Sequence, residues 1–463
     1  MWEQLTNAWG TAGWRMRQVI YDIAGDFLRD RQGVAAVFFV LALVPISAAA
    51  GAAIDISRAY LVKHRLGTAI DAAGLAVGAS SGKSEAELTQ ILNDYFKANY
   101  PAEELGVPAT PVMVIEDSVI KISAKASVDT TLMRVVQISE IEVEASTEII
   151  RETKGLDVVL VLDNTGSMSG SKLSSLKTAS KQFVQILFGD HNEAEDLLVG
   201  VVPFAGTVNV GTAATFESNF INPNPPDSAF SPDHWRGCVE ARPAPHDQQD
   251  TNQVNGGKWT KYLWPDNSSN RWYYLNSNQT NHQYYGPNKQ CPIELLPLTN
   301  QKNTIINKID DMLANGLTHI NIGAVWGWRV LSPTSPYVEG HDYNDPDYNK
   351  AIVIMTDGQN TSPSGNTYTA YGLLSEGNLG TTYSSYTAQR ELDDRLSAIC
   401  TNIKAQNVLV YTITFQVSSS STRNLLRGCA TDAGKYFNSP SNSELEKTFR
   451  AIGAELSNLR IGK

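Results

Sequence analysis

One stretch near the start of the chain constrains the fold more than any other. Residues 33–54, which read GVAAVFFVLALVPISAAAGAAI, form a run of 22 residues without a charged side chain. An α-helix of about 20 apolar residues is long enough to cross the roughly 30 Å hydrocarbon core of a bilayer. We therefore predict a retained transmembrane helix here, because the run is longer and begins later than the apolar core of a signal peptide.

The segments on either side of this span predict how the protein meets the membrane. Residues 1–32 carry apolar and aromatic side chains at helical spacing, which favours an amphipathic segment on the cytoplasmic face. After the span, alanine-rich sequence continues without a helix breaker to about residue 80. Residues 106–150 then alternate apolar and polar side chains, as half-buried antiparallel strands do. We expect a small helical and β module over residues 55–150.

The four cysteines indicate the cellular compartment in which their part of the chain folds. They are Cys238, Cys291, Cys400 and Cys429, and none lies in a C-x-x-C pair of the kind that binds zinc or shuttles electrons. An even, well-spaced set suits disulfides in an oxidising compartment, while free buried thiols in a cytosolic protein are the alternative. Pairing of sequence neighbours would join Cys238 to Cys291 and Cys400 to Cys429, although three connectivities are open.

The charged residues indicate the orientation of the chain in the membrane and argue against one class of partner. Four basic residues shortly before the span and three shortly after it bias the N-terminal side weakly toward the cytoplasm. With the cysteines, this places the C-terminal bulk outside the cytoplasm. The chain has 37 basic and 48 acidic residues and a net charge of -11, which argues against a nucleic-acid binder. At 463 residues, two or three folded units are expected.

From residue 154 onward, apolar strands alternate with helices. Strands this apolar are buried on both faces, so we predict an α/β fold with a doubly wound, mainly parallel, Rossmann-like sheet over residues 154–463. Long insertions interrupt the pattern at about 212–300 and 359–385. The first is rich in Trp and Tyr, which suit either internal packing or recognition, and its two cysteines favour an ordered cap.

The motif that most clearly predicts a functional site is VVLVLDNTGSMSG, residues 158–170. Asp163 ends an apolar strand, and the hydroxyls of Thr165 and Ser167 follow. Ligands bind parallel sheets at the carboxyl ends of the strands, where Thr318 of ANGLTHINIGA and Asp357 of AIVIMTDG are also expected. Carboxylate and hydroxyl oxygens suit a hard cation. These five residues therefore predict a divalent-cation site, with Mg²⁺ as the expected ion and Mn²⁺ or Ca²⁺ as alternatives.

This order of residues resembles the von Willebrand factor type A domain with its metal-ion-dependent adhesion site. The family pattern is D-x-S/T-x-S, a distant Thr and a strand-terminal T-D-G. The resemblance implies that the hydroxyls of Thr165, Ser167 and Thr318 contact the cation, and that the two aspartates bind it directly or through water. One coordination position then stays open for an acidic residue of a protein partner. The sequence departs from the family at Leu317 and His319, where Gly and Asn are common.

Outside the two insertions, nearly the whole chain resembles the TadG-like proteins of the bacterial tight-adherence (Flp) pilus system. The single span followed by R-A-Y-L and A-I-D-A-A-G-L-A, the WGWRVLSP of residues 326–333 and the C-terminal IGAELSNLRI carry this resemblance, together with AIC and LLRGCA around Cys400 and Cys429. It implies a single-pass protein of the bacterial inner membrane with its bulk in the periplasm, which assists pilus assembly or adhesion. We also expect Cys400 and Cys429 to tie the last helices to the sheet.

Two alternatives compete with a metal-dependent binding function. In the first, the chain is a structural scaffold of the envelope or pilus, and the metal only stabilises the fold. In the second, DNTGS and TDGQN resemble DKTGT and GDGxND of P-type ATPases, in which the aspartate accepts a phosphoryl group. Asn164 replaces the lysine of that motif, Thr361 replaces its second aspartate, and one span cannot form an ion path. We therefore expect a non-enzymatic protein, whose oligomeric state the sequence does not indicate.

Overall fold

The computed structural model describes residues 31–80, 85–101, 105–116, 119–150, 154–231, 234–272 and 284–460. The chain divides into two compact units, Met1–Arg151 and Glu152–Lys463. The amphipathic segment expected at residues 1–32 lies, up to residue 30, outside the described residues.

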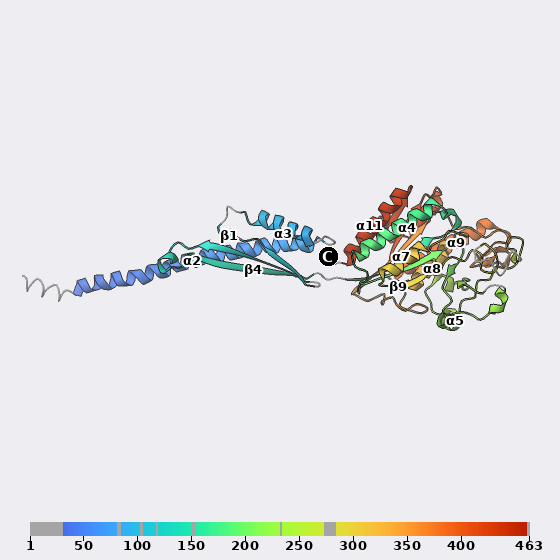
Figure 1. The fold of residues 1–463 in the computed structure, drawn as a ribbon, viewed down its shortest axis with the longest axis horizontal. Coiled ribbons are helices and arrows are strands. Elements are labelled where there is room, and N and C mark those ends of the chain that lie inside the picture. The colour runs from blue at the N-terminus through green and yellow to red at the C-terminus, as the bar shows by residue number, and fades with distance from the viewer. Residues whose placement is uncertain are drawn as a thin grey trace, which may run out of the picture. The chain divides into compact units, whose positions relative to one another are not determined.

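The N-terminal unit is built on one long helix, α2 (Arg31–Gly78), of 48 residues (Figure 1). Within the described residues, it is the helix with the length and composition to cross a membrane. Every side chain from Val37 to Ala50 is exposed, whereas from Gly51 onward a buried residue recurs about every third or fourth position. Residues 37–50 of α2 are therefore an apolar stretch with no other described part of the chain packed over it, and from Gly51 onward the helix packs against the rest of the unit.

An antiparallel sheet and a second helix cover that second half. They are α3 (Glu85–Asn99), β1 (Val107–Pro108), β2 (Val112–Glu116), β3 (Val119–Asp129), η1 (Met133–Val136) and β4 (Glu140–Ile150). β3 pairs with β4 along its whole length, and with β1 and β2 on its other edge. Every second residue of β3 is buried, in a core shared with Val62 and Leu66 of α2 and Leu92 of α3. This is the period of two that the sequence shows.

The C-terminal unit contains one large sheet. Its elements are β5 (Gly155–Asp163), η2 (Gly166–Met168), α4 (Ser171–Phe188), β6 (Leu197–Phe204), β7 (Val208–Asn209), α5 (Ala214–Phe220), η3 (Asp227–Phe230), β8 (Cys238–Val239), η4 (His246–Gln248), α6 (Gln253–Gly256), β9 (Leu296–Thr299), α7 (Lys302–Asp310), α8 (Ile320–Leu331), β10 (Tyr348–Thr356), β11 (Tyr368–Thr369), β12 (Gly372–Leu373), η6 (Leu374–Glu376), α9 (Ser385–Ala405), β13 (Leu409–Phe415), α10 (Ser420–Cys429), η7 (Ala433–Lys435), β14 (Tyr436–Ser439) and α11 (Asn442–Arg460). The strand order is β14-β13-β10-β5-β6-β7-β8, with β9 also paired to β6. β14, β13, β10, β5 and β6 run parallel, and β7, β8 and β9 are antiparallel additions. The predicted mainly parallel α/β fold is confirmed.

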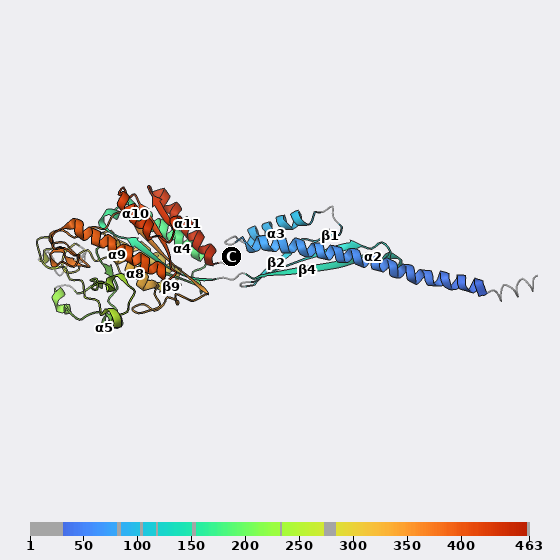
Figure 2. The same cartoon turned by 180° about the vertical axis from the view of Figure 1, so that it is seen from behind.

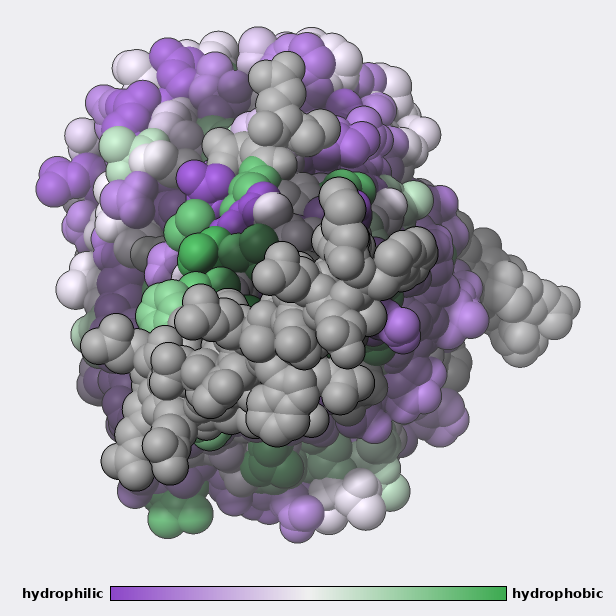
Figure 3. All heavy atoms as spheres, turned by 90° about the vertical axis from the view of Figure 1, so that its left-hand side faces the viewer, coloured by the Kyte–Doolittle hydropathy of each residue, from purple (hydrophilic) through white to green (hydrophobic). Residues whose placement is uncertain are grey.

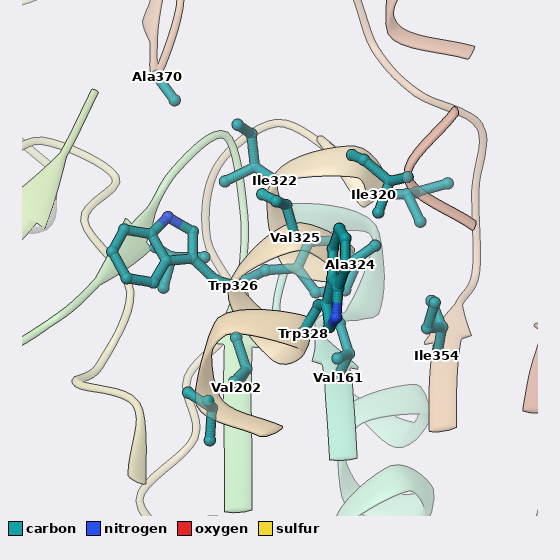
Figure 4. Close-up of a cluster of buried hydrophobic side chains, with 14 of the residues drawn as sticks. Val161, Val202, Ile320, Ile322, Ala324, Val325, Trp326, Trp328, Ile354 and Ala370 are labelled. Carbon is teal, nitrogen blue, oxygen red and sulfur yellow. The ribbon is translucent and has the colours of Figure 1, made fainter. Parts of the chain in front are cut away.

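Helices cover both faces of this sheet, α4, α7 and α11 on one and α8, α9 and α10 on the other (Figures 1 and 2). Alternate residues of β5 therefore enter two separate cores, Leu160 beneath α4 and Val161 beneath α8. Figure 4 shows Val161 among the side chains of α8. Because a Cβ at Gly327 would lie 2.3 Å from the Val161 side chain, glycine is what lets α8 approach the sheet so closely. Burial on both faces explains the unbroken apolar strands.

The two insertions pack together as one lobe. The Ala241 N–H donates to the Ala370 carbonyl at 2.7 Å, and the Tyr368 hydroxyl donates to the Glu240 carboxylate. Arg395 of α9 pairs with buried Asp247 at 2.7 Å, which joins the lobe to the helical layer. Among the described residues of the first insertion, four tryptophan and tyrosine side chains are buried, namely Trp235, Trp259, Tyr262 and Trp264. These four residues serve packing, whereas the sequence had left packing and recognition open.

Both cysteine pairs of sequence neighbours are joined in the structure. Cys238 and Cys291 bond within the first insertion, with their Cα atoms 5.8 Å apart. Cys400 of α9 bonds to Cys429 of α10, with a Cα separation of 5.1 Å. The second bond therefore links two helices of one layer, whereas we expected it to tie the last helices to the sheet. α10 could not be predicted from the sequence, because this short polar helix buries only Thr422, Leu426 and Cys429.

Candidate metal centre

The two aspartates of the predicted site lie side by side because their strands do. β5 and β10 pair in parallel, with Leu162 opposite Met355, so both strands end at the same edge of the sheet. Asp163 is the last residue of β5, and Asp357 directly follows β10. The Asp357 N–H lies 3.4 Å from Asp163 Oδ2, and the Thr356 hydroxyl donates to the same oxygen at 2.7 Å.

The turn after β5 adds two hydroxyls to these carboxylates. Asp163 Oδ1 accepts the Thr165 N–H at 2.9 Å, which bends the chain back over the strand end. The hydroxyls of Thr165 and Ser167 lie 3.0 Å apart, and Ser167 donates to Asp357 Oδ1 at 2.6 Å. Four of the five predicted ligands thus form one continuous hydrogen-bonded group.

The fifth predicted ligand, Thr318, is carried to the same edge by the loop before α8. The Gly166 N–H donates to the Gly316 carbonyl at 3.0 Å, so this loop is bonded directly to the turn after β5. The Thr318 carbonyl accepts the Thr361 N–H at 2.8 Å, which bonds the loop to the segment after β10 as well. In the described part of the chain, the Thr318 hydroxyl makes no hydrogen bond to the other four residues.

His319, one of the two departures from the family pattern, helps hold this loop. Its ring is fully buried, and its Nε2 donates to the Thr361 carbonyl at 3.2 Å. Burial lowers the pKa of His319 to about 4, so the ring is neutral near pH 7. Asn360, which the sequence analysis did not single out, accepts the Ile320 N–H at the start of α8 and donates to Asp393 of α9. The loop is therefore fixed by side chains on both of its sides.

The site concentrates negative charge below an open rim. Asp163 is completely buried, and this desolvation together with the nearby charge of Asp357 raises the pKa of Asp163 to about 6. Lys172, in the first turn of α4, places its Nζ 2.6 Å from Asp357 Oδ2 and supplies one positive charge to the two carboxylates. Ser167, which donates to Asp357, and Gln359, two residues beyond Asp357 in the chain, are exposed to solvent and form this rim.

The donor chemistry of this group fits a hard divalent cation. Carboxylate and hydroxyl oxygens are the ligands that Mg²⁺ and Ca²⁺ take in proteins, and a bound cation would relieve the repulsion that two buried carboxylates exert on each other. The sequence motif predicts these oxygen donors but does not predict the role of Lys172. The available signal was its position in S-G-S-K, which places it in the first turn of the helix that follows the motif.

A family comparison supports the resemblance at the N-terminus. Residues 33–80 match the family model described as "Putative Flp pilus-assembly TadE/G-like". The match covers the candidate transmembrane helix and the packed half of α2. No curated protein matches this chain.

Solved structures similar to the chain include domains of pilus proteins. The vWF domain of the type V pili tip protein Mfa5 from Porphyromonas gingivalis is 14% identical with a TM-score of 0.37, and the alignment covers 67% of this chain and 97% of that one. The pilus adhesin SpaC from Lactobacillus rhamnosus GG is 12% identical with a TM-score of 0.35, covering 77% of this chain and 35% of SpaC. Proximal thread matrix protein 1 from the mussel byssus, with a zinc-occupied MIDAS motif, is 12% identical with a TM-score of 0.33, covering 67% and 47%.

Proposed function

We propose that this chain is a membrane-anchored, non-enzymatic binding protein of the Flp pilus system. In this proposal, Asp163, Thr165, Ser167, Thr318 and Asp357 hold a divalent cation, and the cation binds an acidic residue of a pilus or envelope protein. The observation that carries the proposal is the meeting of two buried carboxylates with hydroxyls beneath an exposed rim. The family match at residues 33–80 supports the assignment to the pilus system.

Each part of the site has a role in this function. The cation, when bound, supplies positive charge and an open coordination position for a carboxylate of the partner. At four of the five positions, the protein supplies side chains that are already ordered by hydrogen bonds within the group, so little ordering is needed there when the cation binds. The exposed rim at Ser167 and Gln359 gives a partner side chain access to this point.

The surroundings of Asp163 favour binding over phosphoryl transfer. A nucleophilic aspartate needs an oxygen that a phosphoryl group can reach. Here Asp163 has no exposed surface, and its two carboxylate oxygens accept hydrogen bonds from the Thr165 N–H and the Thr356 hydroxyl. Such an anion suits a fixed ligand position better than covalent catalysis.

The proposed topology is single-pass, with α2 in the inner membrane and the C-terminal bulk in the periplasm. Exposed apolar side chains along the first half of α2 support the membrane position. Two disulfides in the C-terminal unit support an oxidising compartment for that unit.

The test is capture of partner proteins by the full-length protein in detergent. The bait is incubated with an envelope extract of the cells that produce it, in Mg²⁺ and in chelator, beside Asp163→Ala. The control variant is Asp190→Ala, an exposed aspartate just beyond the C-terminal end of α4. We expect capture by the wild type and Asp190→Ala in Mg²⁺ only, and none by Asp163→Ala.

Unchanged capture in chelator and with Asp163→Ala would contradict metal-bridged binding. If Mg²⁺ then still raised the melting temperature of the wild type but not of Asp163→Ala, the metal would be structural. A phosphoaspartate at Asp163 after incubation with nucleotide would instead establish an enzyme.

A further inference from the structure

The turn between β3 and β4 is fixed to α2 where the exposed part of that helix ends. The Asp55 carboxylate accepts the backbone N–H groups of residues 131–133 at 3.0, 2.9 and 2.8 Å. Arg58, one turn further along α2, donates to the Thr131 hydroxyl at 2.6 Å. A Cβ at Gly51 would lie 2.5 Å from the Leu132 Cβ, so glycine leaves room for Leu132 against the helix. The turn is therefore level with residues 51–55 of α2.

Helix geometry places this level at the edge of a bilayer. From Gly33 to Ala50, α2 has 18 uncharged residues, which span about 27 Å at a rise of about 1.5 Å per residue. The hydrocarbon core is about 30 Å thick, and Arg31 makes an earlier start of the span costly. A span that begins at Gly33 thus reaches the far edge of the core at or just beyond Gly51, where the turn is attached.

The turn itself is apolar and exposed at this level. Leu132 is 44% exposed and Ile138 is 42% exposed, although both are hydrophobic. The Arg134 side chain, between them in sequence, is 59% exposed. Figure 3 shows green hydrophobic residues exposed among purple hydrophilic ones on the side of the molecule where α2 begins. Apolar side chains beside a long cationic side chain are typical of segments that lie in the membrane interface.

We propose that residues 131–139 form a second membrane contact, which inserts Leu132 and Ile138 at the boundary between lipid headgroups and acyl chains. The proposal rests on the membrane anchoring by α2 proposed above. Because the turn is held by hydrogen bonds and by close packing at Gly51, this second contact fixes the height and rotation of the N-terminal unit on the bilayer.

Depth-dependent fluorescence quenching tests this contact. All four native cysteines are in disulfides, so an introduced cysteine is a single site for a thiol-reactive fluorophore. The full-length variants Leu132→Cys and Ile138→Cys are labelled and placed in vesicles of phosphatidylcholine and phosphatidylglycerol that carry a quencher near the headgroup. Ala50→Cys reports the span. Lys121→Cys, exposed on β3 and about 26 Å along the strand from Asp129, reports the part of the unit away from the turn.

We expect strong quenching at positions 50, 132 and 138 and at least several-fold weaker quenching at position 121. Quenching at position 50 without quenching at 132 and 138 would overturn the second contact and leave the anchoring by α2 intact; water or another protein would then cover the turn. Absence of quenching at position 50 would overturn the anchoring, and this proposal with it.

Discussion

The Asp357 carboxylate has a different partner on each oxygen. Ser167 donates a hydrogen bond to one oxygen, and Lys172 forms an ion pair with the other. A cation bound at this site must share or displace the ammonium group, because both require the same negative charge. We predict that Lys172→Gln binds Mg²⁺ several-fold more tightly than the wild type does. The same substitution should lower the melting temperature in chelator, since the two carboxylates then lose their cationic neighbour.

The matched control is Lys181→Gln. Lys181 also lies on α4 and pairs with an aspartate, Asp310, at 2.7 Å, but this ion pair is exposed to solvent. It should leave Mg²⁺ affinity and stability nearly unchanged, because exposed ion pairs contribute little. Calorimetric titration with Mg²⁺ measures the affinities. Equal or weaker Mg²⁺ binding by Lys172→Gln would show that Lys172 does not compete with the cation.

Glu240, in the lobe formed by the insertions, makes stability depend on pH. Burial, with a smaller effect from the charge of Glu376, raises the pKa of Glu240 to about 7 from an ordinary value near 4.5. The folded protein therefore holds this proton more tightly than the unfolded chain does. The stability that Glu240 contributes is complete below about pH 4.5 and is lost as the pH rises through about 7.

We predict that Glu240→Gln removes this loss while its amide oxygen still accepts the Tyr368 hydroxyl. Relative to the wild type, the variant should gain up to about 3 kcal/mol of unfolding free energy between pH 4.5 and pH 8, because one pKa unit corresponds to about 1.4 kcal/mol. Urea unfolding at the two pH values measures the difference. Parallel pH dependence in the two proteins would refute it.

At the scale of elements, the contact between α4 and α11 holds one helical layer on the sheet. Phe183 of α4 is fully buried and meets Phe449 of α11 edge to face, with ring centroids 6.2 Å apart. We predict that Phe183→Ala costs about 3–5 kcal/mol of unfolding free energy, since it leaves a cavity in the core. Tyr386→Ala, at a side chain of α9 that is 71% exposed, should cost less than about 0.5 kcal/mol. Similar urea midpoints for both variants would contradict this packing.

The elements also show what could be predicted from the sequence. β5 and β10 are long apolar runs without helical periodicity, which predicts buried strands of a parallel sheet. Because the two strands end at the same edge of that sheet, their order in the sequence also predicts that Asp163 and Asp357 lie close together. Short elements carried too little periodicity: β9 has four residues and pairs with β6 through an irregular register. Lys172 and Asn360 were missed for another reason. Their roles depend on how helices and loops turn at the sheet edge, which a period along one segment does not encode.

At the scale of the whole molecule, the two units have separate cores. The core of the N-terminal unit lies between α2, α3 and its own sheet, and the cores of the C-terminal unit lie on the two faces of the larger sheet. We predict that a fragment of residues 152–463 folds cooperatively without the membrane helix and is stabilised by Mg²⁺ to the same extent as the full chain. Thermal unfolding with and without Mg²⁺ checks this. A fragment that stays unfolded, or that does not respond to Mg²⁺, would show that the units depend on each other.

The most direct test of the account is whether the five residues at the sheet edge hold a divalent cation. The full-length protein is freed of metal with chelator and titrated with Mg²⁺ in a calorimeter, beside Asp163→Asn and the control Asp190→Asn. Thermal unfolding in chelator shows whether each variant is folded. We predict saturable binding at one site in the wild type and in Asp190→Asn, and none in folded Asp163→Asn. No binding by the wild type, or equal binding by Asp163→Asn, would contradict the account.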